Sequence, residues 1–231
     1  DDWQIENRKL LAALRRYADL NGIEIRENMQ IERLCVEDGI VTGAETDNEK
    51  LAADVTILAT GAWTSLIKLG VAEMPFKIEP IRGQVIAFQT AKRLFQRVIY
   101  SPRGYIVPRA DGRILAGSTT ERAGFDKELT ETAAGSLREM ASEIAPSTYG
   151  LTTSDHWSGL RPAAADKMPV VGRLNSVGGL VIATAHYRNG ILLAPWTAET
   201  VARSVFNHTV SALPDAFSPD RFRLRRVSTS S

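Results

Sequence analysis

A decapeptide near the end of the chain, His186 to Pro195, constrains the fold more than any other segment. It reads HYRNGILLAP, so a polar stretch with an arginine and an asparagine runs through a glycine into an apolar helical run. We expect a helix to begin here, with free backbone amides beside the Arg188 side chain. Such a helix start can hold an anion, because unpaired N–H groups and the helix dipole both favour negative charge.

Two further segments carry groups that can bind a carboxylate. GLRP supplies Arg161, and GYIVPR supplies Tyr105 on a strand-like stretch. Arginine presents a planar fork of N–H donors that matches the two oxygens of a carboxylate. Each residue also has a purely structural interpretation: Arg161 as an ion-pair residue, Tyr105 as a half-buried aromatic and Arg188 as a loop cap.

Read in order, these segments resemble the glycine oxidases of thiamine biosynthesis and their relatives in the D-amino-acid-oxidase-like flavoprotein superfamily. The resemblance runs from about Leu10 to about Phe222 and includes ATGAW at 59–63, IRGQ at 81–84, YIVPRADGRILAGST at 105–119 and RPAAADKMPVVG at 161–172. It implies an α/β (α+β) fold, with an incomplete FAD-binding Rossmann-like domain and an antiparallel-sheet substrate domain. The implied division is 1–73 and 160–208 for the FAD-binding domain, 74–159 for the substrate domain and 209–231 for a C-terminal tail.

The nucleotide-binding start of that family is missing from the sequence. Such enzymes open with a strand, a GxGxxG turn and a helix that hold the FAD pyrophosphate. Here none of the 17 glycines stands two positions from another, so no GxG occurs. We therefore expect the C-terminal part of such an enzyme, in which the strands of 1–73 and 160–208 leave apolar faces without a partner. A non-catalytic remnant that serves as an interaction domain is the alternative from another functional class.

The resemblance also implies a function, which is the FAD-dependent oxidative deamination of glycine or another small amino acid. Hydride passes from the α-carbon to the flavin, O2 is the electron acceptor, and the products are the imine or 2-oxo acid, ammonia and H2O2. The setting implied is thiamine biosynthesis in the cytoplasm. A D-amino-acid dehydrogenase that uses an acceptor other than O2 is the alternative within the enzyme class, and a homo-oligomer is left open.

The site residues follow from the same resemblance. Tyr105, Arg161 and Arg188 are expected to bind the substrate carboxylate, and no catalytic base is assigned because the amine need only be neutral. Thr120 stands where a larger apolar residue is expected near the substrate. The residues expected at FAD are Ile31, Thr60, Gly61, His186, Tyr187, Arg188, Asn189, Gly190, Ile191 and Leu192.

Composition limits which cofactor linkages, partners and metal sites can be expected. Relatives that tether flavin do so through a cysteine near the segment RPAAADKMP, and the only cysteine here is Cys35, so FAD is expected to be non-covalent. A net charge of +1 argues against nucleic acid, and no apolar run reaches the roughly 20 residues that span a bilayer. His156, His186 and His208 have no metal-ligand spacing, so no metal site is expected.

Periodicity and turn residues predict the secondary structure. Helices are expected at 8–20, 130–144 and 189–206. Strands are expected at 23–26, 31–36, 40–44, 55–60, 84–89, 97–100, 105–108, 113–118 and 180–184. The Asp111–Gly112 pair and the residues 37–39 are the predicted hairpin turns.

Overall fold

The computed structural model describes residues 4–70, 73–206 and 214–222. The chain divides into two compact units, 1–30 and 31–231. His208 and most of the predicted tail, 209–213 and 223–231, lie outside the described residues.

The first unit contains one helix, α1 (Asn7–Leu20), as the sequence predicts. The helix ends at Asn21, whose backbone N–H bonds to Tyr17 and Ala18, and Gly22 follows with a positive φ of 66°. The predicted strand at 23–26 is wrong. The Ile23 amide instead donates to the Ala18 carbonyl and closes the helix, and a strand needs a neighbour to pair with.

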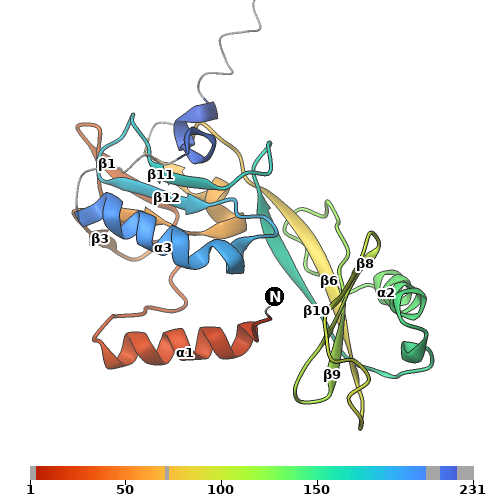
Figure 1. The fold of residues 1–231 in the computed structure, drawn as a ribbon. Coiled ribbons are helices and arrows are strands. Elements are labelled where there is room, and N and C mark those ends of the chain that lie inside the picture. The colour runs from red at the N-terminus through yellow and green to blue at the C-terminus, as the bar shows by residue number, and fades with distance from the viewer. Residues whose placement is uncertain (1–3, 71–72, 207–213, 223–231) are drawn as a thin grey trace, which may run out of the picture. The chain divides into compact units, whose positions relative to one another are not determined.

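A five-stranded antiparallel sheet forms the largest element of the second unit (Figure 1). Its order is β10 (Thr153–Ala163), β6 (Glu79–Gln89), β9 (Arg113–Gly117), β8 (Gly104–Pro108) and β7 (Ile99–Ser101). β6 and β10 are the longest strands, and they pair from Thr153 with Phe88 to Ala163 with Glu79. β10 therefore crosses the predicted boundary at 159/160 without a break, and the predicted domain division remains a prediction.

One face of this sheet packs against α2 (Glu131–Ile144) (Figure 1). Ile86, Ile106 and Ala116 are fully buried between sheet and helix, together with Leu137 and Met140 from α2. Because successive side chains of a strand point to opposite faces, the neighbours of these buried residues lie on the other face.

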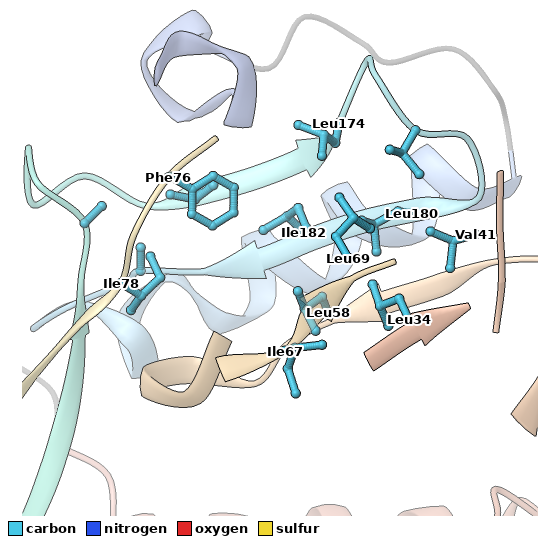
Figure 2. Close-up of a cluster of buried hydrophobic side chains, with 14 residues drawn as sticks. Leu34, Val41, Leu58, Ile67, Leu69, Phe76, Ile78, Leu174, Leu180 and Ile182 are labelled. Carbon is cyan, nitrogen blue, oxygen red and sulfur yellow. The ribbon is translucent and has the colours of Figure 1, made fainter. Parts of the chain in front are cut away.

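Two smaller sheets share a second core. One has the order β3 (Lys50–Ala52), β2 (Ile40–Glu45), β1 (Arg33–Glu37) and β5 (Lys68–Leu69). The other has the order β11 (Val170–Arg173), β12 (Leu180–Thr184) and β4 (Thr56–Leu58), with β12 and β4 parallel. Buried side chains from both sheets and from the segments next to them form this core (Figure 2), among them Leu34, Val41, Leu58, Ile67, Leu69, Phe76, Ile78, Leu174, Leu180 and Ile182.

The expectation that residues 1–73 and 160–208 leave apolar faces without a partner is wrong only in part. Leu11, Leu14 and Leu20 of α1 are each more than half exposed, whereas residues 31–73 and 160–208 share this core. Leu34 and Val41 come from the first stretch and Leu180 and Ile182 from the second, and each is at most 1% exposed. The opposite face of β12 packs on α3 (Gly190–Phe206), with Val171, Val181 and Val201 buried between them.

The predicted α/β (α+β) class is confirmed, with helices, parallel pairs and antiparallel sheets together. The 31–36 and 40–44 hairpin and the hairpin at Asp111–Gly112 are both present. The sequence missed β3, β5, β10, β11 and the first half of β6. β6 is buried on both faces over most of its length, so it lacks the alternation that marks a half-buried strand. Residues 61–66, 146–148, 215–217 and 219–222 form short 3-10 helices.

Candidate active site

Four consecutive residues that begin with the last residue of β9, Gly117 to Thr120, contact all three predicted substrate-binding side chains. Gly117 pairs with Tyr105 across the sheet, and a Cβ at Gly117 would lie 2.7 Å from the Tyr105 hydroxyl oxygen. The tyrosine ring therefore lies against the glycine backbone, on the face opposite α2. This close approach is the reason that a strand glycine is required here.

Arg161 reaches the same place from β10. Its Nη2 donates to the Ser118 Oγ at 2.6 Å, and its Nη1 donates to the Thr119 carbonyl at 3.1 Å. The guanidinium lies across Gly83 of β6, because a Cβ at Gly83 would come within 2.2 Å of Nη1. Both contact atoms are neutral oxygens, so they orient the guanidinium without neutralising its charge.

Arg188 lies in the connection between β12 and α3. Its Nη2 donates to the Thr120 Oγ1 at 2.8 Å, and its guanidinium carbon lies 5.5 Å from the centre of the Tyr187 ring. Tyr187 is fixed in turn, because its backbone N–H donates to the Pro162 carbonyl next to Arg161. The loop after β12 and the end of β10 are thus joined directly.

The pKa of Arg161 is lowered, and its surroundings explain why. Burial is the main cause, the Tyr105 side chain acts in the opposite direction, and the nearby Arg188 cation lowers the pKa further. An arginine remains protonated despite such a shift. The half-buried Arg161 cation therefore lies near the exposed Arg188 cation.

No carboxylate neutralises either cation within the described parts of the chain. The other well-buried arginines differ, since Arg82 pairs with Glu121 and Asp126, and Arg221 pairs with Asp166. Arg161 is half-buried and Arg188 is exposed. Burying an unpaired charge is costly, so an anionic ligand would be favoured at Arg161, with the Arg188 cation nearby. The structure brings Tyr105, Arg161 and Arg188 together as predicted, and their role toward a substrate remains a prediction.

The start of α3 supplies unpaired backbone donors. The helix begins at Gly190, and the Leu193 amide is the first that bonds back along the chain, to the Asn189 carbonyl. Within the described residues, the amides of Gly190, Ile191 and Leu192 have no such acceptor. The side chains of Ile191 and Leu192 are 47% and 78% exposed. A group with negative charge at its edge fits these donors.

His186 anchors this helix start. Its Nε2 lies 2.9 Å from the Thr197 Oγ1 of α3, and burial lowers the pKa of its imidazole. Its predicted contact with a cofactor remains a prediction.

Thr60 and Gly61 lie at the carboxyl end of β4, beside the end of its parallel neighbour β12. The Thr64 hydroxyl lies 3.0 Å from that of Thr184, and both bond to the Gly61 carbonyl, at 2.8 and 3.1 Å. Thr60 donates to Thr64 at 3.1 Å. Ligands of open α/β sheets bind outside the carboxyl ends of parallel strands, so this end of the sheet is a suitable place for a cofactor.

Ile31 stands apart from these contacts. It is half-buried and packs against the core shared by the two smaller sheets, and its predicted role at the adenine of FAD remains a prediction.

Sequence reasoning missed Gly83, Gly117 and Ser118 as parts of the site. The available signal was a glycine inside each of two strand-like runs, IRGQ and ILAGS, because glycine within a strand often marks a close approach. Which side chain approaches could be known only from the register of β6, β8, β9 and β10.

No described helix is both long enough and apolar enough to cross a membrane.

Comparisons with known proteins identify the family of this chain. Residues 1–204 match the protein family described as "DAO: FAD dependent oxidoreductase". The chain is 38% identical over 193 residues to a glycine oxidase of Pseudomonas putida, covering 83% of this chain and 52% of that protein. It is 35% identical over 227 residues to a bifunctional protein ThiO/ThiG of Synechocystis sp., covering 96% of this chain and 34% of that protein.

A solved structure supports the same relation. The glycine oxidase of Geobacillus kaustophilus superposes with a TM-score of 0.81 at 27% identity, covering 91% of this chain and 56% of that one. The chain thus spans about a third to about a half of the length of these relatives.

Proposed function

Because the chain belongs to the FAD-dependent oxidoreductase family known as DAO, we propose that it supplies the substrate site and the flavin-facing part of an FAD-dependent amino-acid oxidase. The observation that carries the proposal is the convergence of Tyr105, Arg161 and Arg188 on residues 117–120, with both cations left without a carboxylate partner in the described residues.

The residues present fit FAD at its flavin end. The unpaired amides of Gly190, Ile191 and Leu192 would face the edge of the ring where negative charge gathers on reduction, and Arg188 adds a positive charge nearby. FAD, when bound, would accept a hydride from the substrate α-carbon. These 231 residues contain no GxG of the kind that holds a pyrophosphate.

The chain's own residues would bind and orient the amino acid. Arg161 can offer the carboxylate two parallel N–H bonds, while the Tyr105 hydroxyl and Arg188 satisfy the remaining lone pairs. Three contacts at one end of a small molecule fix its direction, and the α-carbon is then held toward the start of α3. Holding the reacting carbon in one orientation is itself a large part of catalysis.

We propose glycine or another small primary or secondary amino acid as the substrate, O2 as the electron acceptor, and the imine or 2-oxo acid, ammonia and H2O2 as products. The similarity to proteins named glycine oxidase and ThiO/ThiG supports this choice and a place in thiamine biosynthesis. Thr120 in place of the larger apolar residue leaves room for an amine bigger than glycine.

Anaerobic reduction of bound FAD by a panel of amino acids tests the proposal. The whole protein would be loaded with FAD and mixed with glycine, sarcosine, D-alanine and L-proline, and flavin absorbance would be followed. We expect bleaching by at least one small amino acid, and oxygen uptake when air is admitted. Bleaching without oxygen uptake would instead identify a dehydrogenase with another acceptor, and no bleaching by any amino acid would overturn the proposed activity.

A further inference from the structure

The segment Ser118 to Glu121 contacts both arginines of the proposed site, and each residue contributes in a different way. Ser118 and Thr119 accept from Arg161, and Thr120 accepts from Arg188. Three consecutive residues therefore set where two guanidinium groups lie relative to one another.

The acceptors of this segment are neutral. They are a serine hydroxyl, a backbone carbonyl and a threonine hydroxyl. An arginine has five N–H donors, and these contacts occupy two from Arg161 and one from Arg188. Each guanidinium is therefore held in place while its charge and most of its donors remain available to a ligand.

The one carboxylate of the segment is bound elsewhere. Glu121 accepts from the Nε and Nη2 of Arg82 at 2.9 and 2.7 Å, and from the Gln84 amide at 3.0 and 3.2 Å. The Thr119 hydroxyl also donates to it. The oxygens of Glu121 are occupied by these hydrogen bonds, and within the described residues Glu121 forms no ion pair with Arg161. It lies near enough for its charge to raise the pKa of Arg161.

The same contacts make the segment rigid. The backbone N–H of Arg82 donates to the Glu121 carbonyl and the backbone N–H of Glu121 donates to the Arg82 carbonyl, both at 2.9 Å. The backbone N–H of Gln84 donates to the Thr119 Oγ1 at 2.8 Å. Gln84 is fully buried and Arg82 is 7% exposed. Ser118 and Thr120 flank Thr119, whose position is fixed by β6.

We propose that Ser118 and Thr120 are positioning residues that hold Arg161 and Arg188 at the spacing a substrate carboxylate requires, and that the hydroxyl of Thr120 acts on substrate through Arg188. This inference rests on the proposed carboxylate site. It assigns a role to two residues that themselves carry no charge, and it accounts for a threonine where the sequence comparison led us to expect an apolar side chain.

Steady-state kinetics of Thr120→Val in the whole, FAD-loaded protein test the proposal. Valine keeps the shape of threonine but lacks the hydroxyl, so Arg188 loses its hydrogen-bond acceptor. We expect KM for the best amino-acid substrate to rise by about 3- to 10-fold, which is the effect of one hydrogen bond. Because the acceptor acts on binding, kcat should change much less. Thr120→Ser, which keeps the hydroxyl, should restore most of the affinity.

Three comparisons separate positioning from general damage. Thr152→Val, an exposed threonine before β10, should leave KM and the melting temperature unchanged. Thr120→Val should add nothing in an Arg188→Ala background, and it should not alter the KM of an amine that lacks a carboxylate. Ser118→Ala should raise KM in the same manner through Arg161.

The outcomes distinguish failure of the proposed carboxylate site from failure of the positioning role. If Arg188→Ala and Arg161→Ala leave KM unchanged, the proposed carboxylate site itself fails. If those variants raise KM but Thr120→Val does not, or if Thr120→Val raises KM equally without Arg188, the positioning role is overturned while the site stands.

Discussion

Arg161 is the residue on which the proposed site depends most. In the whole protein, Arg161→Ala removes a charge-assisted contact with the carboxylate, which we expect to cost about 2–4 kcal/mol in kcat/KM. Arg161→Lys should recover only part of this, since an ammonium cannot form two parallel bonds. Arg138→Ala on the outer helix α2, where the arginine pairs with Glu131, is the matched control. An unchanged kcat/KM in Arg161→Ala would remove this residue from the site.

Gly83 makes room for Arg161, so a single added carbon should disturb the site. In Gly83→Ala the new Cβ would lie 2.2 Å from Nη1 and 2.4 Å from Cζ of Arg161, and the guanidinium must move. We expect KM to rise by about tenfold or more, with the far end of a flexible side chain giving way before the strand does.

The control for this variant is Gly135→Ala on α2, where an added Cβ meets nothing within 4 Å. Replacing a glycine inside a helix should stabilise the protein by about 0.5–1 kcal/mol and leave KM unchanged. Equal KM values for Gly83→Ala and Gly135→Ala would show that Arg161 tolerates displacement.

At the residue scale, the sequence predicted the charged and aromatic groups but not the groups that support them. Tyr105, Arg161 and Arg188 stand in segments that resemble a known family, so their residue types alone suggested their use. Gly83 and Ser118 also stand in such segments, but they have neither a charge nor a ring that would suggest a role. Their part depends on the pairing of β6 with β9 and β10, which is a long-range property that local residue patterns do not contain.

At the scale of elements, the connection between β9 and α2 is tied to β6 through Glu121. The pKa of Glu121 is lowered: burial alone would raise it, but hydrogen bonds from Thr119, Arg82 and Gln84 outweigh that effect. A carboxyl whose pKa is lower in the folded state stabilises the fold fully above its unfolded pKa, which is about 4.3. That contribution is lost as the pH falls through the folded value.

Urea unfolding at a series of pH values measures this contribution. We expect the wild-type free energy of unfolding to fall as the pH drops below about 4.3, and Glu121→Gln to be less stable at pH 7 and to lose less on acidification. Glu139→Gln, an exposed carboxyl on α2, should follow the wild-type pH profile. A Glu121→Gln profile parallel to that of the wild type would show that Glu121 is not the titrating group.

Helices and strands with a local residue pattern were predicted, whereas strands that depend on long-range pairing were missed. α2 and α3 were predicted closely, since their apolar spacing is local and Thr130 caps α2 by accepting from the Ala133 amide. β10 was missed because the sequence TSDHWSGLRPA mixes polar residues, a glycine and a proline. Its strand conformation is supported by pairing with β6 along its whole length, not by its own residue preferences.

At the scale of the whole molecule, the chain should offer more binding groups to the flavin ring of FAD than to its pyrophosphate. We propose that the start of α3 supplies donors for the flavin ring, whereas residues 1–231 contain no GxG for the pyrophosphate. We therefore expect this chain alone to bind FAD weakly or not at all, as measured by flavin absorbance after purification and by titration with FAD. Stoichiometric yellow flavin on the purified chain would mean that a pyrophosphate site exists that the sequence pattern did not reveal.

The two cores should also differ in how well they are protected. β6 and β9 are paired on both sides in the five-stranded sheet, and Ile86 and Ala116 are fully buried there. β4 is an edge strand in the described part of the chain, pairing only with β12, and its Ile57 is 48% exposed. An edge with free N–H and C=O groups is a ready site for another strand.

Hydrogen exchange on the isolated chain and on the whole protein tests this difference. In the isolated chain we expect slow amides in 84–118 and fast exchange at 56–58, because local opening requires less free energy at an edge. In the whole protein, which we propose to complete the cofactor domain, pairing along β4 should slow exchange at 56–58 and leave 84–118 little changed. Equal protection of both regions in the isolated chain would show that the two smaller sheets and their shared core are already complete.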